Sequence, residues 1–298
     1  MKVVLRVLRA LALLLVAAVI CLALFVFIGS ERRLRAKYDM TVEPVAALTD
    51  SASLARGKHL FQSISCSLCH GEDGGGAIME QDRMIGTMAG PNLTTGRGGT
   101  GAQRSDLDWV RAIRRGVRHD GTSLIVMPSE VFTHIADSDL GAMLGYMRQL
   151  PPVDRDVPKS GFGPMGRALL AAGKLNILVA PKTPAFDAPA IPPPAGTSEY
   201  GRYLADVSGC HGCHGYGLSG GRVAGPPGLP PASNLTPTGI GHWTDADFTR
   251  AVREGKRPDS KLIDAFMPWQ VYRNMSDDDL HSLWLYIQTV PPKPFGNK

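Results

Sequence analysis

Cys66-Ser-Leu-Cys69-His70 and Cys210-His-Gly-Cys213-His214 are the two stretches that decide how this chain of 298 residues is organised. Both have the form C-x-x-C-H, which is typical of covalent haem attachment. In such a motif the two thiols add to the two vinyl groups of one haem, and the adjacent imidazole becomes the proximal iron ligand. We therefore predict two covalently bound haem c groups, one at each motif.

Two other uses of paired cysteines have to be weighed against haem attachment. Structural zinc sites also use two C-x-x-C pairs, but these usually lie about 15–20 residues apart. Here Cys66 and Cys210 are 144 positions apart, which disfavours zinc. Dithiol redox chemistry of the thioredoxin type is the other alternative, and it gives no reason for a histidine after each pair.

The sequence around one motif is repeated around the other. Asn92-Leu-Thr94 returns as Asn234-Leu-Thr236, and Met127-Pro128 returns as Met267-Pro268. The offsets between matching positions stay between 139 and 144 residues over the whole repeat. We infer two copies of one domain, because a repeat of this length is far longer than the unit of a solenoid.

The repeat also tests which residue binds the sixth position of each iron, since a distal ligand should occur in both copies. Of the eleven methionines, Met127 and Met267 are the pair that matches, and each precedes proline. A thioether ligand raises the haem reduction potential relative to a second imidazole. The histidines that could compete do not pair under the repeat: His119, His134, His242 and His281. The predicted metal ligands are therefore His70 with Met127 and His214 with Met267.

Each copy is predicted to contain three helices joined by long Gly- and Pro-rich loops. The first helix runs from about Ser53 into the haem motif in one copy and starts near Glu199 in the other. The second helix begins at a capping signature, Ser105-x-x-Asp108 or Thr244-x-x-Asp247, and ends at glycine. The third ends in both copies at Pro-Pro. A further short helix is expected between Met165 and Val179, packed on one or both domains.

The N-terminal segment is predicted to anchor the chain in a membrane. Residues 10–30 carry no charge, and 21 helical residues extend about 31 Å, enough to cross the hydrocarbon core. The run ends without the small-residue site of a cleaved signal peptide, so we expect it to be retained. The expected divisions are residues 1–40 as anchor with flanks, 50–153 and 197–295 as domains, and 154–196 as linker.

The charge of the chain is concentrated beside this apolar run. Residues 1–40 contain seven basic and two acidic side chains, which account for the whole net charge of +5. The remaining residues are balanced, so no strong positive field is available for nucleic acid. The fifth cysteine, Cys21, lies in the apolar run and is read as a small buried side chain, with no thiol left for a disulfide. Covalent haem attachment places the two domains outside the bacterial cytoplasmic membrane, in the periplasm.

These motifs together resemble the class I cytochrome c domains of bacterial membrane-bound alcohol, aldehyde and sugar-acid dehydrogenases. The resemblance covers residues 50–153 and 197–295 and implies an all-α fold, with two tandem domains after one transmembrane helix. It implies His and Met as axial ligands and a backbone carbonyl at Pro91 that accepts a bond from His70. The second copy has Ser233 in place of that proline. Those subunits usually have three haem motifs and a C-terminal anchor, whereas this chain has two motifs and an N-terminal run.

The expected function is electron transfer by a membrane-anchored dihaem cytochrome c, without a catalytic residue of its own. Two filled axial positions leave no open iron for a substrate. The expected donor is a periplasmic dehydrogenase or a quinol-linked protein, and the expected acceptor is a terminal oxidase or another cytochrome. Two haems on an N-terminal anchor also resemble the dihaem subunit of cbb3-type oxidases. A dihaem peroxidase-like enzyme is a third alternative, which would need one accessible iron.

Overall fold

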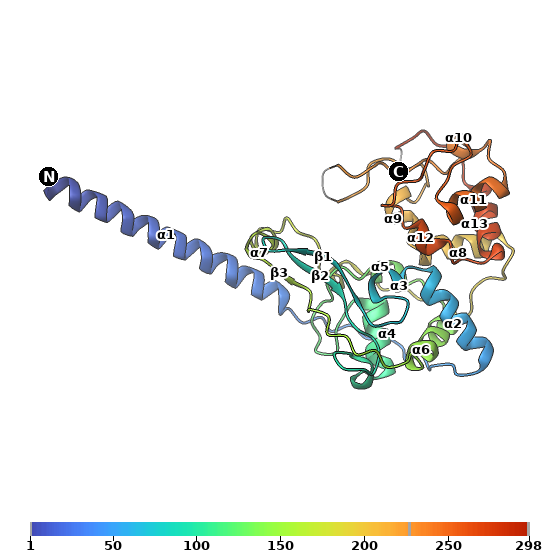
Figure 1. Ribbon diagram of the computed structural model, residues 1–298, viewed down its shortest axis with the longest axis horizontal. Helices are drawn as coiled ribbons and strands as arrows, with labels where there is room; N and C mark the ends of the chain where they lie inside the picture. The colour runs from blue at the N-terminus through green and yellow to red at the C-terminus, as the bar shows by residue number, and fades with distance from the viewer. Residues whose placement is uncertain (1, 226–227, 297–298) are drawn as a thin grey trace.

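The computed structural model describes residues 2–225 and 228–296 of the chain, so residue 1 of the expected anchor and residues 226–227 of the second domain lie outside it. One long helix projects from a body with two lobes, and the chain's C-terminus lies in the second lobe (Figure 1). The structure is mostly helical, as expected for the fold class, with a small antiparallel sheet in the first lobe.

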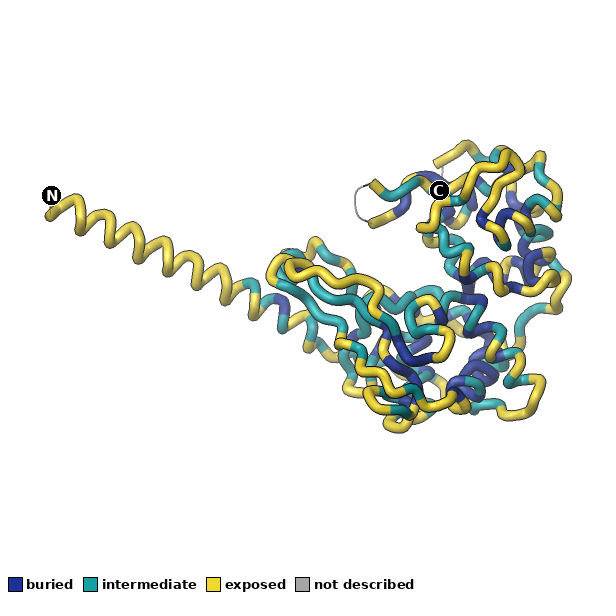
Figure 2. Tube along the Cα trace, in the orientation of Figure 1, coloured by how far each residue is buried: buried dark blue, intermediate teal, exposed yellow. Residues whose placement is uncertain are grey.

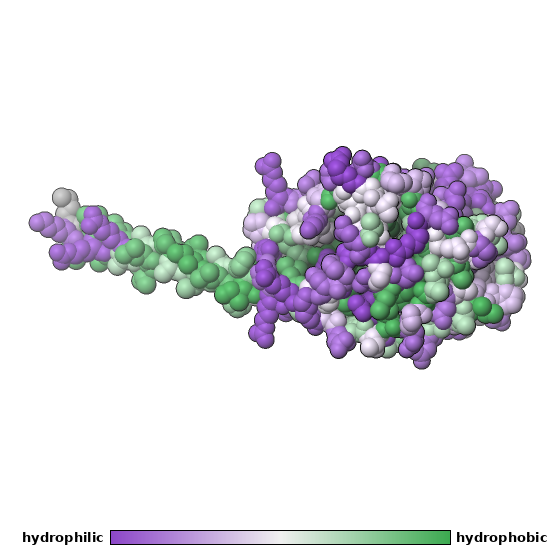
Figure 3. Space-filling model, turned by 90° about the horizontal axis from the view of Figure 1, so that it is seen from below, coloured by the Kyte–Doolittle hydropathy of each residue, from purple (hydrophilic) through white to green (hydrophobic). Residues whose placement is uncertain are grey.

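Helix α1 spans Lys2–Leu34 and is the one helix among the described residues that is long and apolar enough to cross a membrane. It is longer than the uncharged run because its charged flanks are also helical. Its side chains are exposed over most of its length (Figure 2), and hydrophobic side chains fill its middle between hydrophilic ends (Figure 3). Cys21 is exposed on this helix, whereas the sequence analysis had predicted a buried side chain.

The first lobe is built from helices that begin and end where their capping residues stand. They are α2 (Ser51–Ser63), α3 (Cys66–His70), α4 (Asp106–Arg115), α5 (Ser129–Phe132) and α6 (Asp137–Arg148), with a 3-10 turn at Gly101–Gln103. The predicted capping box of α4 is present, since the Ser105 side chain accepts from the Asp108 N–H and the Asp108 side chain from the Ser105 N–H. Gly116 ends α4 with a φ of 63°, a left-handed value that glycine adopts without strain.

The expected first helix is divided in two. It stops at Ser63, and the haem motif forms the separate helix α3, because Ser65 between them has a φ of 77°. A left-handed residue cannot continue a right-handed helix. The second lobe repeats this break at Gly209, with a φ of 75°.

Part of the stretch that the sequence indicated as loop is a sheet. Strands β1 (Ala77–Asp82) and β2 (Gly86–Gly90) form an antiparallel hairpin in which Ala77 pairs with Gly90 and Asp82 with Gly86. Strand β3 (Gly161–Phe162), from the linker, pairs with the end of β2 near the hairpin tip. At the matching place the described residues of the second lobe form loops with one isolated bridge, between Gly221 and Ala232.

The second lobe repeats the helical plan, and its residues up to 225 and from 228 to 296 contain no sheet. Its helices are α8 (Ser198–Val207), α9 (Cys210–His214), α10 (Pro237–Ile240), α11 (Asp245–Glu254), α12 (Trp269–Tyr272) and α13 (Asp277–Thr289). The capping boxes of α11 and α13 are both formed, at Thr244 with Asp247 and at Ser276 with Asp279. The capping signature at Thr244 therefore located the start of α11 correctly.

The helix expected between Met165 and Val179 forms at the start of that range and is shorter than predicted. Helix α7 spans Pro164–Ala171 and is followed by a 3-10 turn at Ala180–Lys182. Its partner is the end of α1 rather than the helices of a domain: a Cβ on Gly29 would lie 3.3 Å from the Cβ of Ala171. Arg167 of α7 also donates to Glu31 Oε1 at 2.8 Å and to Ser30 Oγ at 3.0 Å.

The two lobes meet at two buried aspartates that occupy equivalent positions in the repeat. Asp139 accepts two bonds from Arg56 of its own lobe, at 2.9 and 2.8 Å, and one from Tyr203 of the other lobe, at 2.8 Å. Asp279 in turn is hydrogen-bonded by one side chain from each lobe. We call this set the interdomain clamp, and it consists of Arg56, His59, Asp139, Tyr200, Tyr203 and Asp279.

The second half of the interdomain clamp mirrors the first. Tyr200 donates to Asp279 Oδ1 at 3.0 Å from its own lobe, and His59 Nε2 lies 2.6 Å from Asp279 Oδ2 from the other lobe. Both aspartates are 3% exposed, so every oxygen needs a partner of this kind. Burial raises the pKa of Tyr200 and of Tyr203, which keeps both phenols protonated as donors.

Candidate haem-binding sites

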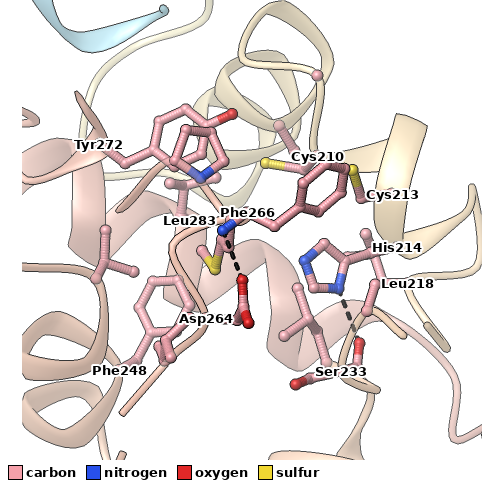
Figure 4. Close-up of a pocket in the computed structure, with 18 of the residues that line it drawn as sticks. Cys210, Cys213, His214, Leu218, Ser233, Phe248, Asp264, Phe266, Tyr272 and Leu283 are labelled. Carbon is pink, nitrogen blue, oxygen red and sulfur yellow. Dashed lines mark hydrogen bonds between the residues drawn. The ribbon is translucent and has the colours of Figure 1, made fainter. Parts of the chain in front are cut away.

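The second copy surrounds a cavity of about 230 Å³ with the residues of its C-x-x-C-H motif. Cys210, Cys213 and His214 line one part of the cavity, and Phe248 lies across from them (Figure 4). Other walls are apolar, and they include Leu218, Val252, Phe266 and Leu283. A flat, largely apolar group fits such walls, because they exclude water and leave polar contacts to a few groups.

The imidazole of His214 is oriented by the backbone. Its Nδ1 lies 2.8 Å from the carbonyl oxygen of Ser233 (Figure 4). A carbonyl can only accept, so Nδ1 carries the proton and Nε2 of the neutral ring keeps its lone pair. Metal-binding histidines are commonly fixed by a bond of this kind from the other ring nitrogen.

The first copy orients its histidine in the same way. His70 Nδ1 lies 3.0 Å from the carbonyl oxygen of Pro91, which confirms the acceptor that the resemblance implied. Burial lowers the pKa of His70, which favours the neutral imidazole that a metal requires. The change from proline to Ser233 in the second copy leaves the interaction intact, because the acceptor is a backbone oxygen.

The four cysteines of the two motifs are half-buried. Burial, followed by the neighbouring cysteine, raises the pKa of Cys66 and of Cys210 to about 12. Burial also raises the pKa of Cys69. Dithiol redox motifs have the opposite property, a lowered pKa that yields a reactive thiolate. This observation disfavours thioredoxin-type chemistry at both motifs.

The zinc alternative needs several ligands to converge on one point. Across residues 2–225 and 228–296, no three His, Cys, Asp or Glu side chains gather as a metal site. The two motifs lie in different lobes, each with one thiol pair, and neither lobe supplies the second pair that a four-cysteine site would require.

Met267 lines the same cavity as the second motif. It comes directly before α12, on a loop held by a bond from its own N–H to the Asp264 carbonyl at 3.1 Å. The cavity therefore brings two thiols, an imidazole and a thioether together. The structure thus assembles in one place the four residues that the repeat had singled out in this copy.

Met127 holds the equivalent place before α5 and packs against the hydrophobic core together with Cys66. The preceding residue, Val126, has a φ of 72°. A β-branched residue in the left-handed region is strained, and such strain is found where a loop must present a particular side chain. The strained backbone at Val126 is consistent with a loop that has to hold the Met127 side chain in one position.

The histidines outside the motifs have other neighbours. His281 Nδ1 lies 2.6 Å from Asp245 Oδ2 on the surface, and His134 contacts the ring of Phe186 with centroids 4.2 Å apart. His211, the spacer of the second motif, stacks on Tyr216 and lies 3.1 Å from Asp206. His59 belongs to the interdomain clamp.

One cavity residue escaped the sequence analysis. Tyr272 lines the cavity, and its hydroxyl donates to the carbonyl of Ser208 at 2.7 Å, two residues before the haem motif. Burial raises its pKa. The signal was present, because Tyr272 matches the aromatic Phe132 under the same shift that pairs the two methionines.

Comparison with known proteins identifies relatives of both copies. The profile of the cytochrome c family matches residues 54–151 and 198–291. The cytochrome c subunit of alcohol dehydrogenase (quinone) from Gluconobacter oxydans (strain 621H) is 27% identical over 83% of this chain and 56% of that protein. The cytochrome subunit of fructose dehydrogenase from Gluconobacter japonicus is 27% identical over 84% and 55%.

A third relative matches a shorter stretch at higher identity. The cytochrome c subunit of gluconate 2-dehydrogenase from Pantoea cypripedii is 36% identical over 33% of this chain and 24% of that protein. The chain thus spans about half the length of the first two relatives. All three of these relatives are cytochrome subunits.

Proposed function

Because this chain belongs to the cytochrome c family, we propose that it is a dihaem electron carrier anchored in a membrane. The observation that carries the proposal is the arrangement found in both copies: two half-buried thiols beside an imidazole whose Nδ1 is fixed by a backbone carbonyl. The proposed domains are residues 50–153 and 197–295, joined by residues 154–196.

Each domain would hold its haem through four residues. The first set is Cys66, Cys69, His70 and Met127, and the second is Cys210, Cys213, His214 and Met267. A bound haem supplies one-electron exchange between ferrous and ferric iron. Histidine and methionine together would occupy both axial positions, which favours electron transfer over reaction with a substrate.

The apolar side chains around the second cavity support this role because they exclude water. Phe248, Leu283 and Phe266 form apolar walls, and a dry surrounding favours the less charged ferrous state. The Ser233 carbonyl holds the imidazole in one orientation and one tautomer, so that ligand needs no rearrangement when the iron changes charge. A fixed ligand set lowers the cost of each transfer.

We propose that the donor is a periplasmic dehydrogenase and the acceptor a terminal oxidase or another cytochrome. The names of the relatives support a dehydrogenase, since they are cytochrome subunits of alcohol, fructose and gluconate dehydrogenases. Helix α1 supports membrane anchoring. The covalent haem motifs support a location of both haem domains in the periplasm, because such haem is attached outside the cytoplasmic membrane. The dihaem subunit of a cbb3-type oxidase has the N-terminal helix in its favour, but these relatives favour the dehydrogenase assignment.

Haem content and ligation test this function directly. We expect intact mass to show two haems per chain that resist acid acetone, and carbon monoxide to bind neither iron in the wild type. In Met127→Ala and in Met267→Ala we expect carbon monoxide to bind one haem per chain, because each change removes one axial ligand. A mass gain of a single haem, or stoichiometric carbon monoxide binding by the wild type, would refute the proposal and favour a peroxidase-like enzyme.

A further inference from the structure

Two segments of the chain next to the first lobe lie alongside α1. It consists of the hairpin tip, residues 82–86, and residues 161–168, which include β3 and the first half of α7; we call these two segments the collar. Between the collar and α1 lies a groove of about 470 Å³. Its lining comes from Val19, Leu22, Ala23, Val26 and Phe27 on one side and from Phe162, Pro164, Arg167 and Ala168 on the other.

The position of this groove along α1 fixes its depth. Ser30 ends the uncharged run, and the groove begins three residues before it at Phe27 and reaches Val19, eleven residues before it. At 1.5 Å per helical residue, the groove therefore lies about 5 to 16 Å inside the end of the run. If residues 10–30 cross the hydrocarbon core, elements packed beside Val19–Phe27 lie at the depth of one leaflet.

We propose that the collar inserts into the outer leaflet beside α1, so that the first haem domain rests on lipid through two elements. The proposal relies on the membrane-anchoring role proposed above for α1. The occupant of the groove and of the collar's outer face is then phospholipid, whose acyl chains already cover the neighbouring surface of α1.

The outer side chains of the collar suit this surrounding. Met84 is 52% exposed, Met165 is 47% exposed and Ile85 is 40% exposed. Single exposed apolar side chains are common on soluble proteins, but three from two adjoining segments form a patch that marks an interaction site. This patch is continuous with α1, whose own apolar side chains are exposed along the same height.

Backbone polar groups of the collar are hydrogen-bonded within the protein, as a surrounding without water requires. Asp82 Oδ1 accepts the N–H groups of Met84 at 2.8 Å and Ile85 at 2.6 Å. The Met84 carbonyl accepts from Met165 and Gly166, at 2.9 and 3.1 Å. The Ile85 carbonyl accepts from Gly163 at 3.0 Å. Irregular backbone is tolerated at membrane depth only when such groups are paired within the protein.

The charges of the collar limit how deep it lies. Arg167 lines the groove and directs its guanidinium to Glu31 and Ser30, at the end of the uncharged run, with the guanidinium carbon 5.4 Å from the centre of the Phe27 ring. This is the geometry of a side chain that reaches from an apolar region to the interface. Arg83 is exposed at the tip, where a long cationic side chain can reach lipid phosphate. The expected depth is therefore the boundary between headgroups and acyl chains.

Insertion would also orient the first haem site. The hairpin joins the collar to the haem motif, because at its base a Cβ on Gly90 would lie 2.0 Å from the carbonyl oxygen of Cys69. The tip of one rigid hairpin would contact lipid while its base contacts the motif. A flexible tether at α1 alone would leave this orientation free.

Photolabelling by lipid tests the proposal on the full-length, haem-loaded protein. The probe is a phosphatidylcholine with a diazirine on the acyl chain near the glycerol, in vesicles that also contain phosphatidylglycerol. We expect adducts on α1 and on peptides that contain residues 82–86 and 161–168. The control peptide contains Tyr216, which is 86% exposed in the second lobe and should remain unlabelled.

The outcomes separate the collar from the anchor. Adducts on α1 alone would overturn collar insertion and leave the anchor intact, whereas no adduct on α1 would refute the anchor and the collar with it.

As a second measurement, Met84→Cys and Tyr216→Cys in a Cys21→Ser chain are treated with a membrane-impermeant maleimide. We expect reconstitution into vesicles to slow labelling at least tenfold at position 84 and to leave it unchanged at position 216. Equal rates at position 84 in vesicles and in detergent would overturn the proposal.

Discussion

Removing the carboxylate of Asp279 should destabilise the haem-loaded protein by about 3 kcal/mol, because this side chain has two roles. As a capping-box residue it accepts the Ser276 N–H at 2.9 Å. As part of the interdomain clamp it accepts from Tyr200 and His59, at 3.0 and 2.6 Å. Loss of a helix cap costs about 1 kcal/mol. The buried Tyr200 hydroxyl and the half-buried His59 ring, left without a partner, cost about 2 kcal/mol more.

The acidity of Asp279 gives a second measure of the same interactions. Burial alone would raise its pKa, but the bond from His59, followed by the Ser276 N–H, lowers the pKa from 3.8 to about 2. A difference of this size corresponds to about 2 kcal/mol of stability. Because the pKa is lower in the folded protein, this contribution is complete above pH 3.8 and is lost as the pH falls towards about 2.

The matched control is Asp247→Ala, which removes a capping box of the same form on the exposed start of α11. Guanidinium unfolding, followed by far-ultraviolet circular dichroism, should show a loss of about 1 kcal/mol for Asp247→Ala and about 3 kcal/mol for Asp279→Ala. A double-mutant cycle with His59→Ala should give a coupling energy of about 1 kcal/mol or more. Equal losses in the two alanine variants would refute the clamp as a source of stability.

Three further changes have defined outcomes. Met267→His should keep that haem low-spin and lower its potential in a redox titration, because imidazole stabilises ferric iron better than a thioether; an unchanged potential would contradict ligation. Gly90→Ala should reduce haem loading of the first motif by intact mass, since its Cβ would lie 2.0 Å from a backbone oxygen, whereas Gly212→Ala, with no atom within 4 Å, should load fully. Ser65→Gly should stabilise the protein by about 0.5–1 kcal/mol in guanidinium unfolding by relieving a left-handed φ of 77°, and no gain would show that other contacts hold that turn.

The helices and the haem motifs could be predicted because their signals are local. A capping box such as Ser105 with Asp108 is satisfied within four residues, and the structure has it as expected. The orientation of His70 by a carbonyl was also predicted, although only through the resemblance. The ligands Met127 and Met267 remain predictions that the proposed variants test.

The sheet and the interdomain clamp could not be predicted in the same way. The β1–β2 hairpin has no clear alternation of apolar and polar residues, and β3 comes from a linker about 70 residues away. Asp139 matches Asp279 under the repeat, but its partner Tyr203 lies 64 residues further along the chain. Contacts of this kind depend on how two lobes pack, which no single stretch of sequence encodes. The break at Ser65 was missed because serine rarely adopts a left-handed conformation.

The interdomain clamp makes the two halves of the chain depend on each other. Each half supplies one aspartate at the same position of the repeat but different partners, Arg56 and His59 in one half and Tyr200 and Tyr203 in the other. Because each aspartate is bonded by both halves, a change at Asp139 or Asp279 is felt in both. Neither half can therefore be exchanged for a copy of the other or passed on as an independent module without a compensating change in its neighbour.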